Sequence, residues 1–266
     1  MKLNKLHLIN EALKEFDNIP STKRLITFIK EKHNIVKRYR EAWFEKLFFG
    51  NTSIEDKYSA LFIDSINAGG IGRLDDKSKS LLDFEKNFAL KYKNDKRQMF
   101  VDLFEDKIYK QLKLKKSGLL ILSAYYTHLI DDKDLSENSD KIVLPIDVVI
   151  CSIFSYVLPK KYEKIIMSNS DELKKALTKY AKEKFGENYP DFVKLDDLWF
   201  WGHFATKRNK KTGLIDSLLP NETQINLDVL VRKNKPGIIS DCKKFVEIVE
   251  EACKESKTIM ESIKVI

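Results

Sequence analysis

Two apolar segments in the middle of the chain, LKLKKSGLLILSAYYTHLI (112–130) and VLPIDVVICSIFSYV (143–157), decide the fold. Both have apolar residues on nearly every face of a helix, which is typical of helices buried in a protein core. A polar, acidic loop joins them. We therefore expect a pair of core helices, around which the more amphipathic segments of the chain pack.

The composition is that of a folded protein with a core of its own. The chain has 266 residues, of which 43% are hydrophobic and 33% are charged, and this balance excludes a disordered chain. Its formal net charge of +8 mildly favours polyanionic partners. The three cysteines, Cys151, Cys242 and Cys253, form no CxxC pair, and their odd number argues against a disulfide framework. These features indicate an intracellular, reducing environment.

The sequence indicates no cofactor, metal or membrane segment. The four histidines are scattered and show no metal-ligand spacing. The longest apolar run, residues 118–130, is interrupted by His128 and is too short to span a bilayer. We therefore expect no metal, no cofactor and no membrane partner, and a cytoplasmic location.

Apolar residues recur at helical spacing along most of the remaining chain. This pattern predicts helices over residues 3–16, 21–49, 53–67, 77–92, 95–112, 170–185 and 238–263. A further aromatic helix is expected to begin near Asp196, and a basic loop follows it at 206–213. Weak strand character occurs only within 214–237, in INLDVLV, so the expected fold class is all-α.

A lysine pair, Lys115 and Lys116, stands at the first turn of the first apolar helix. Burial and the positive N-terminal end of a helix both favour the neutral amine of a lysine. Free lysine has a pKa of about 10.4, so an amine nucleophile at neutral pH needs this help. The alternative interpretation is a pair of surface lysines whose ammonium groups extend into water at a helix end.

Asp147 stands at the start of the second apolar helix, two residues after Pro145. This position predicts an N-cap, in which backbone N–H groups donate to the carboxylate, lower its pKa and keep it ionised. A fixed, ionised carboxylate can stabilise the positive charge that develops at C1′ of a reacting sugar. The alternative is a plain helix cap. The loop before Asp147 is long enough to return the chain to the end of the first helix where Lys116 stands.

Three segments together resemble a known family: KSGLLILSAYYTHL from Lys116, LPIDVVI around Asp147, and LDDLWFWGHF (195–204). They look like the helix-hairpin-helix base-excision DNA glycosylases, and most like the archaeal 8-oxoguanine DNA glycosylases and related OGG-like proteins. In that family a Lys-Ser or Lys-Thr opens an apolar helix, a Pro-hydrophobic-Asp follows, and a Leu-Asp-x-Leu-hydrophobic-aromatic helix comes later. The resemblance covers roughly residues 105–205.

The resemblance implies a bifunctional enzyme of base excision repair. Lys116 would attack C1′ of a damaged nucleotide, expel a base such as 8-oxoguanine and form a Schiff base, after which β-elimination nicks the strand as an AP lyase does. Asp147 would stabilise the sugar cation and assist proton transfer. Asp196 matches a carboxylate that hydrogen-bonds the extruded base, and Phe200 matches an aromatic that stacks on it.

The sequence departs from the family at the base-binding positions. Leu120 stands where the family carries a second stacking aromatic, and Gly118 alone remains of the glycines of the hairpin. Trp199, beside Phe200, is a further candidate platform for a base, because extruded bases are held by stacking on aromatic side chains. Basic side chains are candidate phosphate contacts: Lys115, Lys207, Arg208, Lys210 and Lys211.

The resemblance also implies a two-lobed helical fold with the active site in the groove between the lobes. Residues 1–111 would form an N-terminal lobe with part of the base pocket, 112–205 the catalytic helix-hairpin-helix lobe, and 206–266 a basic loop and a C-terminal helix. We expect a monomer that binds double-stranded DNA at the nucleoid. Two alternatives stay open: an OGG-like glycosylase acting on modified foreign DNA such as that of a phage, and a non-catalytic helical DNA-binding or interaction module.

Overall fold

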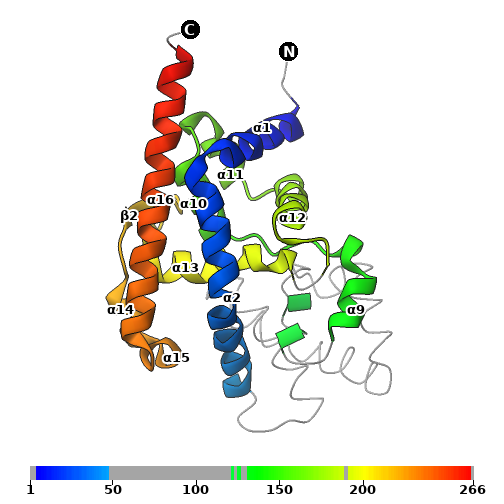
Figure 1. Cartoon of the computed structure of the whole chain (residues 1–266), viewed down its shortest axis with the longest axis vertical. Coiled ribbons are helices and arrows are strands. Elements are labelled where there is room, and N and C mark those ends of the chain that lie inside the picture. The colour runs from blue at the N-terminus through cyan, green and yellow to red at the C-terminus, as the bar shows by residue number, and fades with distance from the viewer. Residues whose placement is uncertain (1–3, 48–120, 123–124, 127–130, 189–190, 265–266) are drawn as a thin grey trace. The chain divides into compact units, whose positions relative to one another are not determined.

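The computed structural model describes residues 4–47, 121–122, 125–126, 131–188 and 191–264 (Figure 1). Most of these residues are helical, and the strands among them form one two-stranded sheet. The mostly helical architecture predicted from the sequence is therefore confirmed. The predicted helices 53–67, 77–92 and 95–112 lie outside the described residues, as do the candidate site residues Lys115, Lys116 and Leu120.

The chain divides into two compact units. The first combines Met1–Val36 with Ile146–Ile266, and the second comprises Lys37–Pro145. These bounds differ from the three-part division expected from the sequence, which stays a prediction.

The first unit consists of helices and one short hairpin. In chain order its elements are α1 (Lys5–Asn18), α2 (Pro20–Leu47, whose residues up to Val36 belong to this unit), α10 (Val148–Val157), η3 (Lys160–Tyr162), α11 (Glu163–Met167), α12 (Asp171–Phe185), η4 (Phe192–Asp196), α13 (Asp197–Ala205), β1 (Thr206–Arg208), β2 (Ile215–Leu218), α14 (Glu222–Leu227), α15 (Val229–Arg232) and α16 (Lys235–Lys264). The predicted helices at 3–16, 21–49, 170–185 and 238–263 are confirmed with shifts of a few residues at their ends.

In the second unit the structure describes α9 (Asp132–Glu137), η2 (Ser139–Lys141) and helical residues at 121–122 and 125–126. The end of α2 belongs to the same unit, and its Arg40 guanidinium lies 5.3 Å from the centre of the Tyr126 ring. A cation over an aromatic face stabilises such a contact by electrostatic attraction to the ring. Leu135 and Leu144 are buried within this unit.

Helix α10 lies in the core of the first unit, as its mostly apolar sequence predicts. It contacts α11, α13, α16 and β2, and Ile150, Ile153 and Phe154 are 0% exposed. Helix α13 approaches α10 closely at Gly202, where an added Cβ would lie 2.5 Å from Val149 Cγ1 and 2.9 Å from Ile153 Cδ1. Glycine at 202 therefore lets α13 and α10 pack backbone against side chain, and this contact fixes the position of α10.

Helices α2 and α16 run side by side in opposite directions (Figure 1). Ion pairs mark the contact: Arg24 with Glu251 near one end, and Lys32 Nζ with Asp241 Oδ1 at 2.6 Å near the other. Phe245 of α16 is fully buried. It lies on the apolar face that the sequence predicts for the C-terminal helix. The apolar face, more than these partly exposed ion pairs, stabilises the contact.

Two expectations about the region after α13 are wrong. Residues 206–213 are not a simple loop, because Thr206–Arg208 pairs antiparallel with Ile215–Leu218 and forms a hairpin. INLDVLV is not a strand, because it forms α14 and α15. The side chains of Asn221 and Asp228 accept backbone N–H bonds at the starts of these helices, and such caps outweigh the weak strand preference of the β-branched residues.

None of the helices within the described ranges is long and apolar enough to cross a membrane.

Candidate functional site

Asp147 is the N-cap of α10, as the sequence predicts. Its Oδ1 atom accepts hydrogen bonds from the backbone N–H groups of Val149 at 2.9 Å and Ile150 at 3.0 Å. Hydrogen bonds from N–H groups and the positive end of a helix both favour the ionised form of a carboxylate. The residue is half-buried, at the end of a helix whose body is locked in the core. Asp147 is therefore a fixed negative charge with access to solvent.

Arg208, at the end of β1, is a positive charge that interacts electrostatically with this carboxylate. Burial lowers the pKa of the Arg208 guanidinium from its ordinary value, and the charge of Asp147 acts in the opposite direction. A guanidinium keeps its proton at neutral pH even so, because its ordinary pKa is far above 7. The site thus contains two half-buried groups of opposite charge, which the separate predictions of a cap at Asp147 and a basic loop at Arg208 did not connect.

The hairpin turn fixes Arg208 in place. Asn209 N–H donates to Leu214 O at 2.8 Å, Gly213 N–H donates to Asn209 O at 2.9 Å, and Asn209 Oδ1 accepts from the Lys211 N–H at 3.0 Å. Gly213 has φ +75°, and a Cβ there would lie 2.6 Å from Val148 Cγ2. Glycine is required by both its backbone angle and this contact. The turn therefore rests on the first residue of α10, directly beside Asp147.

His203 and Trp199 form a stacked pair on α13. Their ring centres are 5.7 Å apart, and the ring planes differ by 12°. Burial lowers the pKa of His203, the charge of Arg208 lowers it further, and Asp228 opposes both. His203 is therefore a neutral imidazole at pH 7, and it supports one face of the half-buried Trp199.

The base-binding residues suggested by the resemblance divide into buried and half-buried side chains. Asp196, at the end of η4, is 4% exposed, and Phe200 is 0% exposed. The Phe200 ring packs against Trp201 and Phe204, with ring centres 5.0 Å and 4.9 Å apart. Phe200 therefore has no exposed face on which a base can stack in this conformation. Trp199 is the half-buried aromatic of the segment.

The second aspartate of the LDDLWF segment has a structural role. Asp197 is 0% exposed, and its Oδ2 lies 2.7 Å from Nδ1 of the buried His33 on α2. This buried contact ties α2 to the start of α13. Sequence reasoning did not single out His33 for this contact, because 164 positions separate the two residues.

The candidate phosphate contacts of the hairpin are exposed to solvent. Lys207 lies on β1, Lys210 and Lys211 lie in the turn, and all three are exposed. Together with Arg208 they form a basic hairpin, a name used below for residues 206–218. A turn signal was present in the sequence, because Asn209 and Gly213 bracket a short polar segment between β-prone residues.

Comparison with known protein families, with curated proteins and with solved structures gives no match. Among the residues that the structure describes, no group of three or more His, Cys, Asp or Glu side chains is arranged to hold a metal ion.

Proposed function

We propose that the chain is a two-lobed DNA glycosylase with lyase activity, in which Asp147 is the charge partner of the reacting sugar. The observation that carries the proposal is the capped carboxylate of Asp147, fixed by bonds of 2.9 Å and 3.0 Å from Val149 and Ile150. It sits at the position where the resemblance requires an aspartate. A preorganised charge of this kind needs no rearrangement when positive charge develops in the transition state.

In the proposed reaction Lys116 supplies the amine that the chemistry needs. Its nitrogen bonds to C1′ as the bond from C1′ to the damaged base breaks, and the base leaves with a proton. Opening of the sugar ring gives the Schiff base, and β-elimination then breaks the C3′–O bond of the strand. Asp147 offsets the positive charge at the sugar and accepts or returns protons during these steps.

The basic hairpin supplies the proposed contacts to DNA. Lys207, Lys210 and Lys211 are exposed on one short, hydrogen-bonded element. Phosphate contacts of this kind position a protein on a duplex without reading its sequence. We place Trp199, and not Phe200, as the aromatic available to a base, because Trp199 is half-buried while Phe200 is enclosed by the core.

Trapping with borohydride tests the proposal. Borohydride reduces a Schiff base to a stable amine, so incubation with a duplex containing 8-oxoguanine should give a covalent protein–DNA adduct. We expect Lys116→Ala to abolish the adduct and Lys115→Ala to retain it. Loss of the adduct in Lys115→Ala alone would instead assign Lys115 as the nucleophile.

A panel of substrates distinguishes the proposed activity from the two alternative functions. Duplexes with 8-oxoguanine, other oxidised bases and substituted cytosines distinguish repair of damage from action on modified foreign DNA. If the protein bound every duplex but released no base and formed no adduct with any of them, the proposed enzymatic activity would be refuted. The remaining interpretation would be a non-catalytic DNA-binding module.

A further inference from the structure

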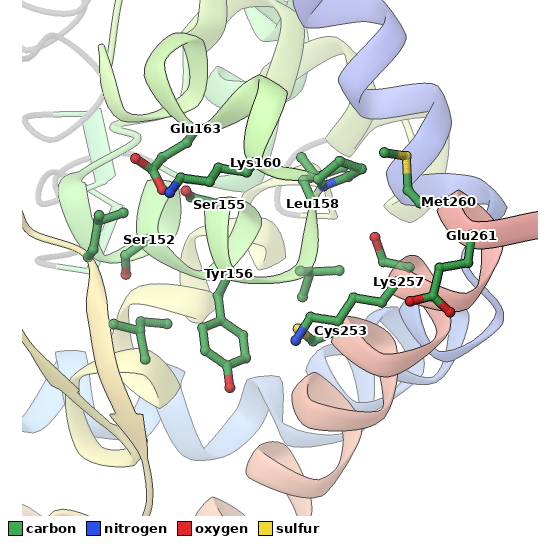
Figure 2. A pocket seen from close by; sticks show the side chains of 15 residues that line it. Ser152, Ser155, Tyr156, Leu158, Lys160, Glu163, Cys253, Lys257, Met260 and Glu261 are labelled. Carbon is green, nitrogen blue, oxygen red and sulfur yellow. The ribbon is translucent and has the colours of Figure 1, made fainter. Parts of the chain in front are cut away.

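A pocket lies in the first unit at the other end of α10 from Asp147. It has a volume of about 540 Å³, within the range of small-molecule sites, which is roughly 300–1,000 Å³. Figure 2 shows that side chains of α10 and α16, among them Tyr156 and Cys253, border the same space. The proposed glycosylase activity uses none of the lining residues.

The floor of the pocket is apolar. Val157 and Leu158 at the end of α10, Leu214 and Ile215 of the hairpin, and Met260 of α16 all line it. Val157 is 1% exposed and Leu158 is 5% exposed, so the floor is continuous with the core. A ligand that covers this surface gains free energy in proportion to the apolar area that it removes from water.

The charged groups around the pocket balance one another. The charged residues of the lining are Lys160 of η3, Glu163 at the start of α11, and Lys257 and Glu261 of α16. The two lysines and the two glutamates carry equal and opposite formal charge, so the lining presents no net charge to a ligand.

One polar group of the lining lacks a hydrogen-bond partner. The Ser155 Oγ atom is buried and makes no hydrogen bond to the part of the chain that the structure describes. Buried hydroxyl groups in folded proteins are nearly always hydrogen-bonded. The residue itself is partly exposed and lines the pocket, so a ligand there can supply the missing partner once the hydroxyl rotates toward it.

From these observations we propose that the pocket is a binding site for an uncharged, mainly apolar small molecule that carries one hydrogen-bonding group. The apolar body of the ligand covers Val157, Leu158 and Met260, and its polar group meets the Ser155 hydroxyl. A ligand with net charge gains nothing from the balanced lysines and glutamates and leaves its own hydration shell.

Nile red, an uncharged dye with a carbonyl acceptor, is a suitable probe. We expect saturable binding of one dye per chain, with a blue shift of its emission. Ser155→Ala should weaken binding about fivefold, the loss of one neutral hydrogen bond, and it leaves no other described group without its partner. A charged dye of similar size, anilinonaphthalene sulfonate, should bind more weakly, and tighter binding of this dye would contradict the uncharged class.

Cys253 provides a readout located in the pocket. Cys253 is 9% exposed, whereas Cys151 and Cys242 are 0% exposed, and burial raises the pKa of the Cys242 thiol to about 12. N-ethylmaleimide should therefore label Cys253 first in the folded protein. Bound Nile red should slow this labelling, and an unchanged labelling rate at saturating dye would place the dye elsewhere and overturn the proposal.

A matched pair of substitutions on α16 localises the effect. Met260→Trp places a bulky indole ring in the pocket. Ile259→Trp places the same ring at the preceding position, which is 38% exposed and outside the lining. We expect Met260→Trp to lose both dye binding and Cys253 protection, and Ile259→Trp to retain both. Equal binding by the two variants would overturn the proposal, as would the absence of saturable binding to the unaltered chain.

Discussion

Asp147 combines a cap and a charge, and two substitutions separate them. Its Oδ1 accepts the N–H groups of Val149 and Ile150 at 2.9 Å and 3.0 Å. Asparagine keeps a side-chain oxygen and caps helices about as well as aspartate, whereas alanine does not cap. Asp147→Asn therefore removes the charge and keeps the cap, and Asp147→Ala removes both.

The expected magnitudes differ for stability and for activity. Asp147→Ala should lower the free energy of unfolding by about 1 kcal/mol, the usual cost of losing a helix cap, and Asp147→Asn by less than about half of that. Arg208 is only half-buried, so water can solvate its charge when the Asp147 carboxylate is neutralised, and the cost of the Asn variant stays small. Both variants should slow base excision by about 100-fold, since loss of one preorganised electrostatic partner typically costs ~10²–10³ in rate.

Urea unfolding and single-turnover excision of 8-oxoguanine measure the two effects on the same preparations. Asp131→Asn is a matched control, because it makes the same chemical change at an exposed position near the start of α9, where Asp131 Oδ1 accepts the Lys133 N–H at 2.9 Å. We expect this control to excise at the unaltered rate. Excision by Asp147→Asn at the unaltered rate would show that Asp147 is only a cap and would refute its role as the charge partner.

Three further predictions concern the surroundings of the site. Gly202→Ala should lower the free energy of unfolding, measured with urea, by about 1–3 kcal/mol through overpacking, because its Cβ would lie 2.5 Å from Val149 Cγ1. The control Gly237→Ala should be neutral or stabilising in the same assay, because its Cβ would meet only the movable Asn234 side chain. The pKa of His203, followed by NMR, should lie below about 6.5, rise in Arg208→Gln and fall further in Asp228→Asn. The contribution of His203 to stability is present above its unfolded pKa and is lost as the pH falls, because the unfolded state then binds the proton first. A His203 that titrates above about 6.5 would contradict its burial. Replacing Lys207, Lys210 or Lys211 by Gln should reduce the slope of log affinity against log salt by about 0.9 for each phosphate that the variant no longer neutralises. The control Lys179→Gln on α12 should leave the slope unchanged. Equal slopes for all four variants would show that the hairpin does not contact DNA.

Local signals in the sequence were sufficient for α10 and its cap. The apolar run and Asp147 after Pro145 predict both the buried helix and its start, because capping and burial depend on adjacent residues. The sequence did not predict the hairpin, because its lysines interrupt the alternation of apolar and polar residues that indicates a strand. Only Asn209 and Gly213, at the two ends of the polar segment, indicate a turn. The electrostatic interaction of Arg208 with Asp147 joins residues far apart in the chain, and no local pattern contains it.

The exposed face of α13 was also beyond the sequence. Apart from Asp197 and His203, near its two ends, the helix Asp197–Ala205 carries no polar side chain that would mark a solvent-facing side. A helix that is apolar all round gives no preferred face. Whether Phe200 or Trp199 meets a base was therefore undetermined until the packing of Phe200 against Trp201 and Phe204 was known.

Helix α10 links the two proposed sites through one rigid element. Asp147 precedes its first turn, and Ser155 and Val157 at its other end line the pocket. Groups on a helix that is fixed by core packing keep their geometry better than groups on loops. The contact of Gly202 with Val149 and Ile153 holds this helix, so Gly202→Ala should disturb both sites together. Asp147→Asn removes only a charge and should leave Nile red binding unchanged. A variant that separates dye binding from excision would thus act at one site, and a variant that changes both would act through the position of α10.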